Sequence, residues 1–249
     1  MATLPSPSLI PSPSRPFDTA RLSLRAVRLP IDEALFTALN NDHLGYMNSS
    51  APNITLPGPT QATKYCEHVA KECLVGAVIW LRDTPNDDAS TNPAKQIPDD
   101  AIRSEWGTAI GEIHLSLPST PAMAHHRSTS IGLTILPGYQ GRGYGREAIE
   151  WALDYAFRRA GLHRVEIRAF GWNEGATRLY ERMGFVREGT ERKAYWHEGR
   201  WWDGVSLGML EDEWWARRRA KSAREGEEEG RRASRAIRIE DEGSKEPLW

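Results

Sequence analysis

The order of apolar and polar positions divides this chain of 249 residues into a strongly patterned middle and two weakly patterned ends. Alternation with a period of two predicts strands, and recurrence with a period of 3.6 predicts helices. A segment rich in glycine, proline and asparagine, residues 43–59, is expected to be a loop. The expected strands are 18–27, 76–81, 109–117, 128–135, 163–170, 185–195 and 201–210, and the expected helices are 30–39, 60–74, 147–160 and 173–183. This mixture predicts an α/β fold.

The most informative stretch runs from residue 128 to residue 160. Ile131, Leu133 and Ile135 alternate with smaller or polar residues and predict a strand. A helix with one apolar face follows. Three glycines at alternate positions, Gly141, Gly143 and Gly145, separate the strand from the helix.

Glycines placed ahead of a helix can have a chemical use. The first turn of a helix presents N–H groups without internal partners, and the helix dipole is positive there. A phosphate can approach these amides when no side chain is in the way, and Arg142 and Arg146 would add positive charge. The alternative is a tight strand-to-helix turn without a ligand.

The spacing excludes two common phosphate-binding loops. A dinucleotide-binding fingerprint needs a glycine where Arg146 stands. A P-loop needs Gly-Lys-Ser/Thr where Gly143-Tyr144-Gly145 stands.

Three motifs in order resemble the GNAT superfamily of N-acetyltransferases over residues 18–215. Residues 140–145, Gln-Gly-Arg-Gly-Tyr-Gly, resemble its Gln/Arg-x-x-Gly-x-Gly/Ala motif. Residues 173–185, from Asn173 through Tyr180 to Gly184-Phe185, resemble its second signature. Residues 198–214 resemble the closing hairpin of the branch that acetylates ribosomal-protein N-termini, the RimJ/RimL-like branch. The resemblance implies a mixed, mostly antiparallel central sheet with helices on both faces, splayed at the acetyl-coenzyme A site.

The resemblance also implies which residues hold acetyl-coenzyme A, the expected co-substrate. Backbone groups near Leu133, Thr134 and Ile135 would bind the pantetheine arm as an added strand does. The glycine motif would hold the pyrophosphate through the amides of Gln140, Gly141, Arg142, Gly143, Tyr144, Gly145 and Arg146. Asn173 has the family's position for a pantetheine contact, and it also suits a helix N-cap.

Two catalytic residues follow from the resemblance. Tyr180 matches the tyrosine that protonates the sulfur of coenzyme A; by spacing alone it would be a core aromatic. Glu112 lies on the polar side of its strand, where the family often places a carboxylate that acts as a base through water; an ordinary solvent-facing or paired glutamate is the alternative. His114 is on the same side and has a suitable pKa in isolation.

Composition and charge add limits. The net charge of −2 gives no reason to expect binding to nucleic acid or to a membrane surface. No apolar run approaches the length of a membrane span, and the N-terminus lacks the pattern of a secretory signal. Cys66 and Cys73 form no metal or redox motif by spacing, so we expect no metal and a reducing compartment, cytoplasmic or nuclear.

The weakly patterned segments define the expected domain limits. Residues 1–16 are rich in proline and serine and are expected to be disordered. Residues 17–215 form a single N-acetyltransferase domain, in which 83–102 is an exposed insertion. Residues 216–249 are mostly charged and are expected to be a solvated helix or disordered. Five tryptophans near the last hairpin could wall an acceptor pocket, form a homodimer interface or cover the core: Trp196, Trp201, Trp202, Trp214 and Trp215.

The expected function is transfer of an acetyl group from acetyl-coenzyme A to a primary amine. A protein N-terminus is the first candidate acceptor, by resemblance to the ribosomal branch, and a small amine or polyamine is the second. A non-catalytic acyl-coenzyme A-binding module is a rival from another class, and Tyr180 argues against it.

Overall fold

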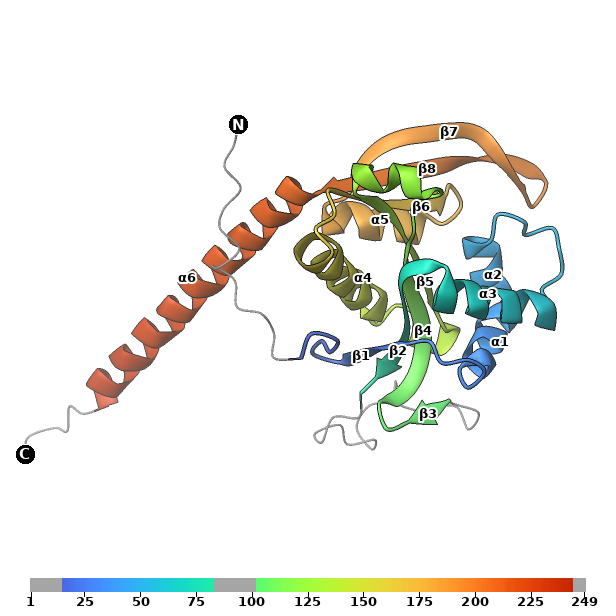
Figure 1. Ribbon diagram of the computed structural model, residues 1–249. Helices are drawn as coiled ribbons and strands as arrows, with labels where there is room; N and C mark the ends of the chain where they lie inside the picture. Colours follow the sequence, from blue (N-terminus) through green and yellow to red (C-terminus); the bar gives the residue numbers. More distant parts are fainter. Residues whose placement is uncertain (1–14, 83–101, 244–249) are drawn as a thin grey trace, which may run out of the picture.

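The computed structural model describes residues 15–82 and 102–243, and their centre is a twisted mixed sheet (Figure 1). Within this part of the chain the sheet has eight strands in the order β1-β2-β4-β5-β6-β8-β7, with β3 added beside β4. The strands are β1 (Leu22–Ala26), β2 (Cys73–Leu81), β3 (Arg103–Ser104), β4 (Gly107–Ser116), β5 (Ser128–Ile135), β6 (Arg164–Phe170), β7 (Val186–His197) and β8 (Arg200–Leu210). Every pair is antiparallel except β5 with β6, so the predicted mostly antiparallel α/β fold is confirmed.

Helices lie on both faces of this sheet, as expected. They are α1 (Glu33–Asn41), α2 (His43–Ser49), α3 (Pro59–Lys71), α4 (Tyr144–Asp154), α5 (Glu174–Met183) and α6 (Glu211–Gly243). Three short turns of helix complete the order: η3 (Pro121–His126), η4 (Pro137–Tyr139) and η5 (Tyr155–Arg159), in which η5 continues α4 with a wider, π-helical turn.

Alternating side chains of the strands feed two separate cores. Ala77 and Ile79 of β2 join a large apolar cluster with Ala148 and Ile149 of α4. Val78 and Trp80 point the other way and pack with Leu35 and Leu39 of α1. The period of two in the sequence therefore corresponds to a sheet that is covered on both faces.

The sheet opens between its two parallel strands. β5 pairs with β6 only where Ser128–Ser130 meets Arg164–Glu166. Beyond these residues the strands diverge, and the edge of β5 from Ile131 to Ile135 faces a cleft. This divergence is the splay that the resemblance implies, and it comes directly before the glycine motif.

The helix ends and the last hairpin turn follow local signals in the sequence at three places. The side-chain oxygen of Asn173 accepts a hydrogen bond of 3.2 Å from the amide of Ala176, so Asn173 caps α5. Gly184 ends α5 in the left-handed conformation, with φ of 95°. Glu198 and Gly199 join β7 to β8 with φ of 46° and 78°, the conformation of a tight hairpin turn.

Two predictions of secondary structure are wrong. The helix expected over 60–74 ends at Lys71, and Cys73 and Leu74 already belong to strand β2. Residues 43–59 were expected to be a loop, but His43–Ser49 forms helix α2. This helix buries none of its residues and contains Gly45 and Asn48, so it lacks the apolar stripe on which the prediction depends.

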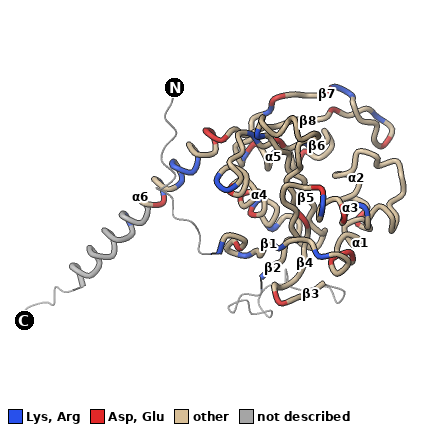
Figure 2. Tube along the Cα trace, in the orientation of Figure 1, with Lys and Arg blue, Asp and Glu red and all other residues tan. Residues whose placement is uncertain are grey.

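The C-terminal segment continues the fold as one long helix. α6 begins at Glu211, before the expected domain limit at residue 216, and its first turns anchor it through the buried Trp214. Acidic residues open the helix and basic residues follow (Figure 2). The disorder expected for residues 1–16 and the insertion expected at 83–102 lie almost wholly outside the described residues, and the single-domain limits stay a prediction.

The described helices include none that is both long enough and apolar enough to cross a bilayer. The tryptophans of the last hairpin divide by exposure. Trp214 is buried against Phe157, whereas Trp196 and Trp201 stack edge to face and remain about half exposed.

Candidate active site

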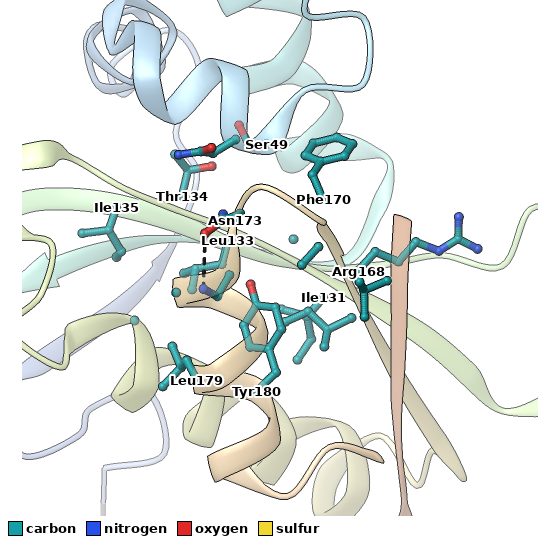
Figure 3. A pocket seen from close by; sticks show the side chains of 18 of the residues that line it. Ser49, Ile131, Leu133, Thr134, Ile135, Arg168, Phe170, Asn173, Leu179 and Tyr180 are labelled. Carbon is teal, nitrogen blue, oxygen red and sulfur yellow. Dashed lines mark hydrogen bonds between the residues drawn. The ribbon is translucent and has the colours of Figure 1, made fainter. Parts of the chain in front are cut away.

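A cleft with a volume of about 1030 Å³ follows the opening between β5 and β6. Figure 3 shows β5 side chains, the start of α5 and the end of α2 converging on it. The predicted cofactor residues that line it are Leu133, Thr134, Ile135, Gln140, Gly141, Gly143, Gly145, Arg146, Asn173 and Tyr180. The structure thus brings together two motifs that are separated in the sequence.

The glycine motif forms the entrance to α4. Gly141 and Gly143 have φ of 71° and 82°, a left-handed backbone that favours glycine. Helix α4 starts at Tyr144, so the amides of its first turn have no partner inside the helix. Gly145 has an ordinary helical backbone and lines the cleft. A Cβ at this position would lie 3.4 Å from the side chain of Leu133. This arrangement fits an anion held by backbone amides.

The side chains of the motif have separate tasks. The side-chain nitrogen Nε2 of Gln140 donates a 2.7 Å hydrogen bond to the carbonyl of Ile135, so Gln140 ties the turn to the end of β5. Arg146 lines the cleft while paired with Glu150 at 3.0 Å. Arg142 and Tyr144 are not among the residues that line the cleft, so the contacts expected of their amides with the cofactor stay a prediction.

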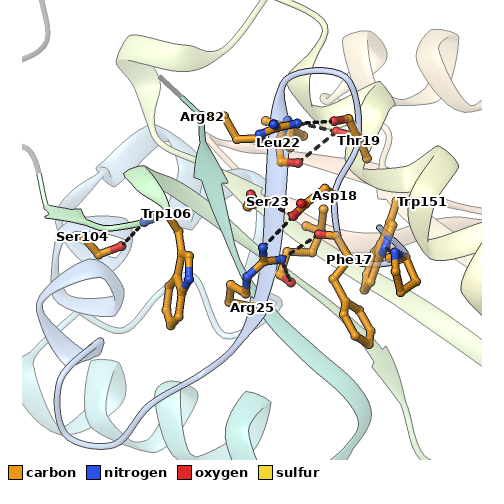
Figure 4. Close-up of polar contacts among 12 residues, drawn as sticks. Phe17, Asp18, Thr19, Leu22, Ser23, Arg25, Arg82, Ser104, Trp106 and Trp151 are labelled. Atoms are coloured by element: carbon orange, nitrogen blue, oxygen red, sulfur yellow. Dashed lines mark hydrogen bonds and ion pairs between the residues drawn. The ribbon is translucent and has the colours of Figure 1, made fainter. Parts of the chain in front are cut away.

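A contact from the N-terminal segment fixes this turn. Arg21 donates from its backbone amide and from Nε to the carboxylate of Glu147, at 2.8 Å and 2.7 Å, and from Nη1 to the carbonyl of Arg142 at 3.1 Å. The segment itself is held by ion pairing of Asp18 with Arg25 and by a bond from Arg82 to the carbonyl of Thr19 (Figure 4). Sequence reasoning missed Arg21, because no local pattern links it to a motif more than a hundred residues away.

Asn173 and Tyr180 present polar groups from α5 to the cleft (Figure 3). The oxygen of Asn173 is used in capping the helix, which leaves its amide nitrogen for a ligand. The Tyr180 ring packs 6.1 Å from Phe185, and its hydroxyl points into the cleft. Burial raises the pKa of Tyr180 to about 12, so the hydroxyl keeps its proton at neutral pH and can donate it.

Glu112 is more enclosed than its strand pattern predicts. The expected water-exposed carboxylate is fully buried on the side of β4 that faces α3, and it does not line the cleft. It accepts hydrogen bonds from the Tyr65 hydroxyl at 2.7 Å and from Nδ1 of His114 at 3.0 Å. The alternation of apolar and polar residues in β4 was predicted correctly. Helix α3 packs over the polar face, however, and so removes Glu112 from solvent.

A chain of hydrogen bonds nevertheless joins Glu112 to the cleft. Thr134, which lines the cleft, hydrogen-bonds the Tyr65 hydroxyl, and Tyr65 donates to Glu112. Burial and the nearby Glu112 raise the pKa of Tyr65 well above its usual value. Burial acts to lower the pKa of His114, but the charge and hydrogen bond of Glu112 outweigh burial and raise it. Sequence reasoning did not identify Tyr65, which lies 47 residues before Glu112.

The far end of the cleft is assembled from distant segments. Gly45, Asn48 and Ser49 of α2 form one wall, and Glu191 and Tyr195 of β7 form another. The indole nitrogen of Trp172 donates to the side-chain oxygen of Asn48 at 3.1 Å and so joins α2 to the loop before α5.

Comparison with known proteins relates this site to a family. A model of the acetyltransferase (GNAT) family matches residues 100–185. The spermidine N(1)-acetyltransferase of Vibrio cholerae is 35% identical over 89 residues, 36% of this chain and 51% of that protein. The N-alpha-acetyltransferase RimI of Mycobacterium tuberculosis is 39% identical over 151 residues, 60% of this chain and 89% of that protein.

A solved structure agrees with the fold. Spermidine N-acetyltransferase from Vibrio cholerae in complex with CoA and spermine superposes with a TM-score of 0.58 at 23% identity, covering 78% of this chain and 98% of that one. In sequence, the chain spans about half the length of several curated relatives that it matches, the spermidine enzyme among them. It spans most of RimI at an identity well above 30%, and it therefore belongs to the GNAT family of acetyltransferases.

Proposed function

We propose that this protein transfers an acetyl group from acetyl-coenzyme A to a primary amine. The observation that carries the proposal is the convergence of three features on one cleft: the unpartnered amides at the start of α4, the open edge of β5, and the protonated Tyr180. The amides suit a pyrophosphate, and the strand edge suits the amide groups of a pantetheine arm.

Tyr180 has the properties that a general acid needs. A thioester that is attacked by an amine releases a thiolate, and a nearby hydroxyl can protonate that sulfur as it departs. With a pKa of about 12, the hydroxyl of Tyr180 is protonated before the reaction. We assign Tyr180 the role of donor to the sulfur, with Asn173 orienting the pantetheine arm.

Glu112 can serve as the final proton acceptor without entering the cleft. The ammonium of the acceptor must lose a proton before it attacks. Thr134 and Tyr65 form a path along which each hydroxyl accepts one proton and donates another, so that the net transfer ends on Glu112. In this role Tyr65 is a positioning and relay residue, and it replaces the water that the sequence analysis expected.

The acceptor end of the cleft favours a cationic amine. Glu191 adds negative charge to its walls, and Phe170 and Tyr195 add aromatic faces, which attract ammonium groups. We propose a protein N-terminus as the first acceptor, supported by the extent of similarity to RimI. The Glu191 carboxylate and the similarity to spermidine acetyltransferases favour a polyamine as the second.

The experiment is release of free thiol from acetyl-coenzyme A with matched acceptors. The panel contains a peptide with a free N-terminus, the same peptide with its N-terminus blocked and a lysine retained, and spermidine. We expect the first peptide to react and the blocked peptide to be inert. Preference for spermidine would select the polyamine, and cofactor binding without thiol release for any amine would indicate a non-catalytic binding module.

The setting of this activity is also a proposal. Cys66 and Cys73 are both free thiols, which is consistent with a reducing, cytoplasmic compartment. A homodimer remains a prediction, and the half-exposed Trp196 and Trp201 are the residues with which to test it by light scattering.

A further inference from the structure

A second group of reactive side chains lies outside the cleft, where the end of α3, the start of β2 and the middle of β4 meet. His68 is in the last turn of α3, Cys73 is the first residue of β2, and His114 is on β4. One ligand atom from each lies within 4.8 Å of the other two. We propose that His68, Cys73 and His114 form a binding site for a divalent transition metal ion, with Zn²⁺ as the best match.

The donor types and their spacing fit zinc. Two imidazoles and one thiolate suit Zn²⁺ and exclude Mg²⁺ and Ca²⁺, which prefer oxygen ligands. Zn–S and Zn–N bonds at a tetrahedral angle place sulfur and nitrogen about 3.6 Å apart. Sγ of Cys73 lies 3.6 Å from Nε2 of His68, so one edge of the tetrahedron already has the required length.

Both histidines carry the outer contacts that are typical of metal ligands. Nδ1 of His68 lies 2.9 Å from Glu72, and Nδ1 of His114 lies 3.0 Å from Glu112. An ionised carboxylate only accepts hydrogen bonds, so each Nδ1 holds its proton and each Nε2 keeps a free electron pair. This carboxylate–histidine pairing fixes the tautomer that binds a metal. Its occurrence on both histidines of one group is the strongest support for the site.

The backbone holds the ligands in place. Cys73 pairs with Ser116 and Gly76 pairs with His114 across β2 and β4. The His114 ring rests on Gly132, where a Cβ would lie 2.1 Å from its Cε1. Gly76 lets α3 approach closely, because a Cβ there would lie 1.9 Å from the carbonyl of Val69. The His68 side chain is 43% exposed, which leaves a path for the ion and room for a water as fourth ligand.

The proton balance of binding is simple. In the metal-free protein Cys73 is a thiol, as an ordinary cysteine is at neutral pH, and its Sγ lies 3.6 Å from Nε2 of His68. When Zn²⁺ binds, the S–H bond breaks, a Zn–S bond forms and one proton leaves to solvent. The thiolate offsets one of the two positive charges of the ion, and the nearby carboxylates of Glu72 and Glu112 offset the other.

The test uses the full chain, reduced and freed of metal by a chelator, with no acetyl-coenzyme A present. Titration with Zn²⁺ alone should give one ion per chain and a higher melting temperature. Cys73→Ser and His68→Ala should each weaken binding by more than about 100-fold, and Glu72→Gln by about 10-fold. Cys66→Ser and His43→Ala, a thiol and an exposed imidazole outside the group, should bind as the wild type does. Co²⁺ should give a thiolate charge-transfer band that Cys73→Ser lacks.

Three results would each overturn the site: no stoichiometric Zn²⁺ uptake by the folded wild type, uptake that persists unchanged in Cys73→Ser, or a Co²⁺ spectrum without the thiolate band. His68 is partly exposed on a helix surface, so His68→Ala should fold. The test therefore stays decisive even if Cys73→Ser does not fold. Since neither readout involves acetyl transfer, this inference stands or falls separately from the proposed function.

Discussion

The two sides of the central strands β4 and β5 are built in contrasting ways. The side of α4 and α5 holds the glycine turn, which offers backbone amides, together with the side chains of Asn173 and Tyr180, and all three come from two compact motifs. The side of α1 and α3 holds Glu112, Tyr65 and His114, which act through side chains alone. Backbone amides can bind a phosphate whatever side chains surround them, so the first side suits a phosphate-containing ligand. The second side depends instead on which side chains are present.

The largest effect is expected on the glycine side. Gly145→Val should leave the fold intact, since Gly145 has a helical backbone and a Cβ would make only ordinary contacts. The added side chain blocks approach to the first-turn amides, and loss of one or two charge-assisted hydrogen bonds should weaken acetyl-coenzyme A binding by about 10²–10³-fold. Calorimetry on folded protein measures this.

The matched control is Gly138→Val. Gly138 has open space around its Cβ position and is not among the residues that line the cleft. Equal affinity in the wild type and in Gly145→Val would mean that the glycines serve only the turn. Gly143 is a poorer choice, because its φ of 82° would add backbone strain to any substitution.

Tyr180→Phe should lower turnover by about 10²-fold, the lower end of the range for general acids, because a thiolate leaves fairly well without help. The ring and its contact with Phe185 remain, so acetyl-coenzyme A affinity and the melting temperature should change little. Turnover and affinity are measured on the same preparation. Wild-type turnover in a folded variant would remove Tyr180 from the mechanism.

Tyr65→Phe examines whether the α3 side takes part in the chemistry at all. The ring would keep its edge-to-face contact with Phe36 at 5.5 Å, but the path from Thr134 to Glu112 would be broken. We expect turnover to fall by about 10-fold with unchanged cofactor affinity. Tyr46→Phe, on the exposed α2, is the control. A drop in stability alone would make the Glu112 cluster structural.

The contrast between the two sides also explains what the sequence could predict. The fold and the cofactor side were accessible, because alternation in β5, helical periodicity in α4 and α5, and the Asn173 and Gly184 caps are local signals. The burial of Glu112 was not, because it depends on α3 lying over β4. Arg21 and the group of His68, Cys73 and His114 were missed for the same reason: their partners are distant in the sequence and no spacing rule links them.

The smallest effect on turnover is expected at Glu147, a second largely buried carboxylate. Its partner is the permanently charged Arg21, whereas the partners of Glu112 are the titratable Tyr65 and His114. Burial acts to raise the pKa of Glu147, but hydrogen bonds from Thr19 and Arg21 outweigh burial and lower it. Its stabilising contribution is therefore fully present above the unfolded pKa of about 4.3 and is lost as the pH falls through the lower folded pKa. Glu147→Gln should cost about 2 kcal/mol of unfolding free energy at pH 7 and change turnover little.

Urea unfolding at a series of pH values tests this assignment. The stability difference between the wild type and Glu147→Gln should shrink as the pH drops below about 4, since protonation makes the two side chains equivalent in charge. Glu150→Gln on the same helix, an exposed partner of Arg146, should change stability by well under about 1 kcal/mol. A large loss of turnover in Glu147→Gln without loss of stability would contradict this assignment. It would mean that Glu147 takes part in the chemistry, whereas we assign the role of proton acceptor to Glu112 and a structural role to Glu147.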